Sequence, residues 1–251
     1  MGERWPDETD LLSFDIEISD VFTLEPGEDM ERYAPFHISV AATAVPGGEE
    51  RHWLSLDEND VPMLNLTPRR AHELLEYLEA KLHEGYALCA WNGLHFDLKW
   101  IGYQADDMPL AARIALRIYD PMFQFFNEHG YPVGLASVAE GLGIAQTKLM
   151  NGADAPKEWR AGRFERVKDY VLGDCQITNQ IVQAIRDSGR IQWVNRNGQR
   201  KAKPMPRLMT VEEVISAPGP DQSWMDRPLP KAEFHRWVDE ALTSRQLDLG
   251  L

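Results

Sequence analysis

The stretch from Leu11 to Ile18, LLSFDIEI, most constrains the fold because an otherwise apolar run carries two acids. Successive side chains of a β-strand point to opposite faces, so Asp15 and Glu17 share one face while the other face is apolar. Neighbouring carboxylates repel each other, and burial of an unpaired ion costs several kcal/mol. The pattern therefore predicts a strand with a cation or a solvent-filled cleft beside the acids. An edge strand with one face in water fits the octamer equally well.

The pattern up to residue 186 indicates an α/β domain. Thr67 and Pro68 mark the start of a helix whose apolar positions recur at helical spacing until Gly85. Three antiparallel strands followed by alternating helices and strands predict a mixed five-stranded sheet with flanking helices. The other predicted strands cover residues 36–45, 52–56, 86–91 and 113–120, and the other helices cover 134–144 and 163–186, with 92–104 as a loop that enters a helix.

The remaining residues, 187–251, form a C-terminal extension to this domain of residues 1–186. The chain carries −14, but seven basic residues and one acid between Arg186 and Arg207 give that segment +6 and leave −20 elsewhere. The segment is predicted as a hairpin that turns at Asn197-Gly198 and follows a phosphate backbone, with Trp193 stacking on bases. A solvated face that improves solubility is equally open. A tail rich in Pro and Trp follows, with a last helix near residues 231–242.

Cysteine usage and hydropathy point to the cytoplasm. Cys89 and Cys175 have no C-x-x-C spacing, which argues against a disulfide framework and a zinc site. The acidic start, MGERWPDETD, is unlike a signal peptide, and no segment approaches the roughly 18 apolar residues of a membrane span. We therefore expect a cytoplasmic protein with no membrane partner.

Two later stretches carry acids that complement those of the first strand. WNGLHFDLKW contains an N-x-x-x-F-D pattern formed by Asn92, Phe96 and Asp97. In RVKDYVLGDCQ, Tyr170 and Asp174 are four residues apart, so a helix places them on one face. Three separated segments thus offer carboxylates to one site.

Tyr103 and Asp107 repeat the Y-x-x-x-D spacing. They lie in a stretch that runs into Pro109, and we predict no helix there. This second pair is therefore not assigned to the site.

D-x-E on the first strand, N-x-x-x-F-D after the fourth and Y-x-x-x-D on a late helix resemble the DEDD superfamily of 3′-to-5′ exonucleases. The tyrosine resembles that of the DEDDy branch, since a DEDDh enzyme would have histidine at the position of Asp169. The motifs are similar to those of the proofreading domains of family B DNA polymerases. The resemblance covers Leu11 to Arg186 and implies an RNase H-like fold.

The resemblance also implies a mechanism, in which four acids hold two Mg²⁺ or Mn²⁺ ions about 3.5–4 Å apart. One ion would activate a water and the other would stabilise the departing 3′ oxygen, releasing nucleoside 5′-monophosphates. Tyr170 would orient the water, because a phenol with a pKa of about 10 is a poor base at neutral pH. The ligands implied are Asp15, Glu17, Asp97 and Asp174.

Single-stranded nucleic acid with a free 3′ end is the expected substrate, with DNA favoured over RNA. Asn92 is a candidate substrate contact, and Trp91 and Phe96 are candidates for stacking on the terminal base. Each has a structural alternative: Asn92 as a turn former, the two aromatics as core residues, and Tyr170 as a side chain that packs against the sheet.

Other functions remain open from the residues alone. A catalytically inactive RNase H-like module that binds nucleic acid or acts as a scaffold is the main alternative. A glycosidase is less favoured, because Asp15 and Glu17 neighbour each other on one strand rather than flank a sugar. The chain has no room for a polymerase, so we expect a free-standing exonuclease or a subunit that joins a replication or repair protein.

Overall fold

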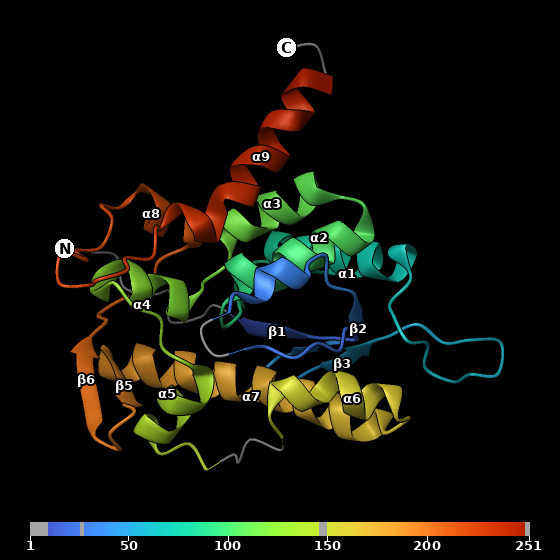
Figure 1. Cartoon of the computed structure of the whole chain (residues 1–251), viewed down its shortest axis with the longest axis horizontal. Helices are drawn as coiled ribbons and strands as arrows, with labels where there is room; N and C mark the ends of the chain where they lie inside the picture. The colour runs from blue at the N-terminus through green and yellow to red at the C-terminus, as the bar shows by residue number, and fades with distance from the viewer. Residues whose placement is uncertain (1–9, 26–27, 146–149, 249–251) are drawn as a thin grey trace.

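A mixed sheet of four strands forms the centre of the computed structural model, which describes residues 10–25, 28–145 and 150–248 (Figure 1). Its order is β3-β2-β1-β4, and β1 pairs antiparallel with β2 and parallel with β4. The two-sided burial of β1 shows that the alternative of an edge strand is wrong. The strands are β1 (Leu11–Ile18), β2 (Ile38–Ala44), β3 (Glu50–Trp53) and β4 (Ala87–Cys89).

Helices cover both faces of the sheet, and the alternation in β1 decides which residues meet which helices. The apolar face of β1, with Phe14 and Ile16, packs in one core with α1 (Pro68–His83), α2 (Leu98–Ala105) and α3 (Met108–Arg117). The opposite face meets α7 (Phe164–Ser188), where the Ser13 hydroxyl donates to the carbonyl of Cys175 at 2.8 Å. Asp15 and Glu17 therefore lie on the α7 side of the sheet.

The fifth strand predicted over residues 113–120 is wrong, because α3 occupies most of this segment. Asp107 caps this helix by accepting from the amide of Leu110 at 2.9 Å, and Pro109 lies in its first turn. Tyr119 alone keeps a strand-like pairing, a parallel bridge to Cys89. The prediction that the stretch around Tyr103 contains no helix is also wrong, since α2 includes this residue.

The predicted α1 and α7 are confirmed, and shorter elements complete the fold. The extension contains the expected hairpin, in which β5 and β6 join through a turn at Asn197-Gly198, and the expected last helix, α9. The remaining elements are η1 (Met30–Tyr33), the π-helical turn η2 (Gly93–Asp97), α4 (Pro121–His129), α5 (Leu135–Leu142), η3 (Gly152–Asp154), α6 (Ala155–Arg160), β5 (Arg190–Val194), β6 (Arg200–Pro204), α8 (Val211–Ser216) and α9 (Ala232–Asp248).

The C-terminal extension packs against the rest of the chain. Phe234 and Trp237 of α9 are buried in the core shared with α1–α3, and α9 projects outward beyond α3 (Figure 1). Trp193 of β5 is 6% exposed and meets the Phe125 ring edge-on at 5.1 Å, so the prediction that it stacks on bases is wrong. No helix in the described ranges has the length and apolar character needed to cross a membrane.

Candidate active site

Three acids from two elements converge on the α7 side of the sheet. Asp15 and Glu17 come from β1, and Asp174 comes from α7. One carboxylate oxygen from each lies within 4.8 Å of the others, although Glu17 is only 9% and Asp174 only 7% exposed. The described residues contain no other group of three acidic, histidine or cysteine side chains with this geometry. The two acids that share one face of β1 therefore meet a third acid from α7.

Packing of α7 along β1 and β2 brings Asp174 to these acids. The Cys175 thiol contacts the carbonyl of Ala42 at 3.4 Å, and the Asn179 amide donates to the carbonyl of Ala44 at 3.0 Å. Together with the bond from Ser13 to Cys175, these contacts fix the rotation and height of the helix against the sheet. Residues at i and i+4 share a helical face, so Tyr170 reaches the same site as Asp174.

The fourth predicted acid, Asp97, comes to the site from a third element, η2. It ends η2, is 2% exposed, and accepts from the amide of Ile16 at 3.1 Å. Ile16 stands between Asp15 and Glu17, so this bond fixes Asp97 at the same point of β1. Burial, together with the charge of Asp120, raises the pKa of Asp97 to about 8.

Asp120 is a buried acid that the sequence reasoning missed. Its carboxylate accepts from the amides of Asn92, Leu94 and Phe123, each at 3.1 Å, and it is 2% exposed. It therefore caps α4 and holds the turn that leads into η2, where Asn92 adopts a left-handed conformation with φ 70°. Burial raises its pKa to about 6. The Asp120-Pro121 pair was the available signal, since it repeats the cap-then-proline pattern of Thr67-Pro68.

A cavity of about 650 Å³ is lined by every residue that the sequence assigned to the site, together with others. Its other walls come from the loop after β1, with Val21, Phe22 and Leu24, and from η3 and α6, with Lys157. The predicted residues that line it are Asp15, Glu17, Trp91, Asn92, Phe96, Asp97, Tyr170 and Asp174.

The two aromatic candidates are half-buried in the cavity wall. Trp91 donates its indole N–H to the carbonyl of Val133 at 3.1 Å, which fixes the orientation of the ring. Phe96 packs at 5.9 Å from the Phe36 ring. Each therefore combines packing with a surface turned to the cavity.

Tyr170 is 2% exposed, and its phenol stays protonated. Burial raises its pKa above the usual range, and the charges of Glu17, Asp174 and Asp15 raise it further. A Cβ added at Gly152 would lie 3.4 Å from the Tyr170 oxygen, so the hydroxyl faces η3. Its chemistry here is that of a hydrogen-bond donor.

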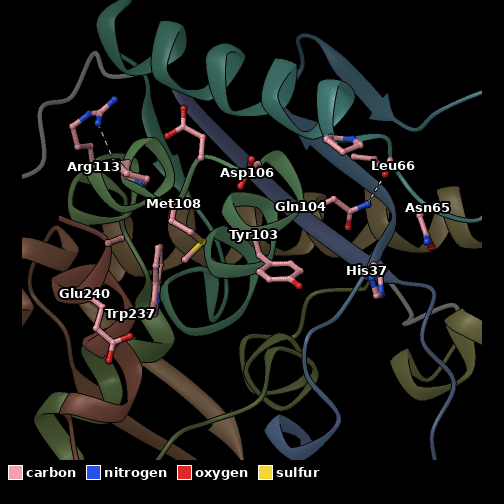
Figure 2. Close-up of a pocket in the computed structure, with 14 residues that line it drawn as sticks. His37, Asn65, Leu66, Tyr103, Gln104, Asp106, Met108, Arg113, Trp237 and Glu240 are labelled. Carbon is pink, nitrogen blue, oxygen red and sulfur yellow. Dashed lines mark hydrogen bonds between the residues drawn. The ribbon is translucent and has the colours of Figure 1, made fainter. Parts of the chain in front are cut away.

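A larger cavity of about 1,200 Å³ lies elsewhere, between α2, α3 and α9. Figure 2 shows Tyr103 and Asp106 in it, with Trp237 and Glu240 of α9 across from them. Asp107 also lines this cavity, although its carboxylate caps α3. The second Tyr-x-x-x-Asp pair is thus separate from the site around Asp174.

The sheet, with acids on its central strand and helices on both faces, is a nuclease fold. The chain belongs to the RNase H superfamily, whose family model matches residues 54–184 and so includes Asp97, Tyr170 and Asp174. Among solved structures, the chain is similar to the family B DNA polymerase from the hyperthermophilic archaeon Pyrobaculum calidifontis, with 18% identity and a TM-score of 0.51. That match covers 73% of this chain but only 25% of the polymerase, and it concerns the fold. No curated protein matches the sequence.

Proposed function

We propose that the protein is a metal-dependent 3′-to-5′ exonuclease that hydrolyses single-stranded nucleic acid. The observation that carries this proposal is the convergence of Asp15, Glu17 and Asp174 within 4.8 Å, in a cavity that Asp97 and Tyr170 also line. Membership of the RNase H superfamily supports the reaction class.

The donor set fits divalent metal ions. Carboxylate oxygens are the protein ligands that Mg²⁺ and Mn²⁺ prefer. Five acids line the cavity (the four predicted ligands and Asp20), and among the described residues Lys157 is the one basic side chain against them. Mutual repulsion among these acids favours the binding of cations. Asp15, Glu17 and Asp174 are the first candidates for ligands, with Asp97 beside them.

Divalent ions, when bound, would offset the repulsion among the acids, lower the pKa of a water and stabilise the departing 3′ oxygen. The residues of the chain supply orientation. The protonated Tyr170 hydroxyl, which is hydrogen-bonded with Asp174, would orient the attacking water. Asp120 holds the turn that carries Asn92 and leads to Asp97. Attack at the terminal phosphodiester releases nucleoside 5′-monophosphates.

The cavity wall suggests how the terminal nucleotide is held. Trp91 and Phe96 offer ring surface to the last base, and Asn92 offers an amide. DNA is favoured over RNA on the fold-level likeness to a DNA polymerase alone. A replication or repair protein as a partner stays a prediction.

A 5′-fluorescent single-stranded 20-mer in Mg²⁺ or Mn²⁺ tests the proposal. We expect the wild type to shorten it and Asp174→Asn to leave it intact. Asp169→Asn is the matched control, because Asp169 is an exposed acid on the same helix and its replacement should preserve activity. Binding without shortening by the wild type would contradict the proposal and favour the inactive nucleic-acid-binding module.

A further inference from the structure

The β5–β6 hairpin carries a group of exposed cations, here called the basic rim. No acidic residue occurs between Asp187 and Glu212, in a chain whose net charge is −14. Among the described residues, no carboxylate forms an ion pair with any side chain of the rim, and all of its members are exposed. The rim consists of Arg190, Arg196, Arg200, Lys201 and Lys203.

Pairing in the hairpin divides the strand cations between the two faces of the β5–β6 ribbon. Lys201 lies opposite Trp193 and Lys203 opposite Ile191, on the face that packs inward, while Arg200 lies opposite Val194 on the other face. Directly opposed residues share a face of a sheet. The inner face is held closely, because a Cβ added at Gly141 of α5 would come within 2.4 Å of the Trp193 Cα. The positions of the rim cations are therefore fixed by the fold.

Protection of an exposed strand edge explains only part of this pattern. Lysines on an edge strand discourage pairing with another chain, which accounts for Lys201 and Lys203. It does not account for Arg190 and Arg200 on the open face, or for Arg196 at the turn. Solubility does not account for them either, since the rest of the chain is strongly acidic. Five exposed cations without an ion pair, gathered on one hairpin, fit a polyanion.

We propose that the basic rim binds the phosphates of a single strand of nucleic acid whose 3′ end lies in the acid cavity. The placement of the 3′ end rests on the proposed function. From Asp174 to Ser188 α7 runs 14 residues, about 21 Å at 1.5 Å per residue, and the hairpin follows directly. A stacked strand of about 3.4 Å per nucleotide spans this distance with about six nucleotides. The rim therefore contacts the strand about six nucleotides from its 3′ end.

Binding at a series of salt concentrations tests the rim without hydrolysis. The assay follows the fluorescence anisotropy of a labelled 20-mer in EDTA, for the wild type and for Arg200→Gln combined with Lys201→Gln. Loss of two phosphate contacts should flatten the slope of log Kd against log salt by about 1.4, at about 0.7 per contact. Arg69→Gln combined with Arg117→Gln is the charge-matched control, since both arginines are exposed on other elements, and it should keep the wild-type slope.

Oligonucleotide length gives the second readout. In Mg²⁺ the rim variant should raise the KM for the 20-mer and leave the KM for a tetramer unchanged, because the tetramer is too short to reach the rim. If the wild type does not hydrolyse either strand, the proposed function fails while the slopes in EDTA still test the rim. Equal slopes for the wild type and the rim variant, with both proteins folded by circular dichroism, would overturn the inference.

Discussion

The acid cavity and the basic rim lie at two ends of the same stretch of α7 and have opposite chemistry. The cavity has five acids, three of them buried, and one lysine, whereas the rim has five exposed cations and no acid. A phosphate can approach the cavity only with cations present, but it can approach the rim directly. One protein should therefore show two separable dependences, on divalent metal at the cavity and on monovalent salt at the rim.

The largest expected effect comes from removing a metal ligand. Asp15→Ala should abolish hydrolysis, while its salt slope for a 20-mer in EDTA should equal that of the wild type. The variant should also stay folded, because loss of one carboxylate relieves repulsion from Glu17 and Asp174. Product analysis on denaturing gels and thermal unfolding check both parts. Wild-type turnover in Asp15→Ala would show that the acid cavity is not the site of hydrolysis.

Metal should stabilise the fold through the cavity alone. An ion that binds only the native state raises the free energy of unfolding by about 2.7 kcal/mol at 100 times its Kd. We expect millimolar Mn²⁺ to raise the Tm of the wild type and of the rim variant equally, and to leave the Tm of Asp15→Ala unchanged. A Tm of the wild type that does not respond to Mn²⁺ would count against the metal site.

Tyr170→Phe should slow hydrolysis about tenfold, which corresponds to the loss of one hydrogen bond of about 1.4 kcal/mol. Its gain in Tm with Mn²⁺ should match that of the wild type, because the phenol is a donor rather than a metal ligand. Single-turnover rates and thermal unfolding measure the two properties. If the variant lost the response to Mn²⁺, the assignment of Tyr170 to the water would be wrong.

The last effect concerns the pH dependence of stability in the absence of metal and leaves the reaction itself aside. Asp120 has a folded pKa of about 6, above its ordinary value of 3.8, so its contribution to stability is full below about pH 4 and is lost as the pH rises through 6. Asp120→Asn should reduce the fall in the unfolding free energy between pH 4 and 6, measured by urea denaturation in EDTA, and leave the part that comes from Asp97, whose pKa is raised to about 8. An unchanged pH dependence in the variant would mean that another group is responsible.

The sequence predicted those parts of the fold that local patterns determine. Alternation in LLSFDIEI gave β1 and its two faces, and the Thr67-Pro68 cap with its apolar spacing gave α1. A strand was predicted over residues 113–120 because Ile114, Ile118 and Tyr119 favour strands. A helix forms instead, because Asp107 caps it and Leu110, Ala111 and Ile114 are buried on one of its faces.

The sequence predicted which residues belong to the candidate site but not how they are arranged. All eight residues that the sequence assigned to the site do line the cavity. The bond from Ile16 to Asp97, however, joins residues 81 apart, and no local pattern reports such a contact. Asp120 escaped notice for the same reason, since two of its three amide donors lie 26 and 28 residues away. The burial of Trp193 against Phe125 likewise depends on tertiary packing.

The time course of hydrolysis of one oligonucleotide, labelled at either end, in Mg²⁺ tests most directly whether the protein is a metal-dependent 3′-to-5′ exonuclease. With the label at the 5′ end, we predict a ladder that shortens one nucleotide at a time. With the label at the 3′ end, we predict immediate release of a labelled mononucleotide and no intermediate lengths. A ladder from the 3′-labelled strand, or identical products with and without EDTA, would contradict a metal-dependent 3′-to-5′ exonuclease.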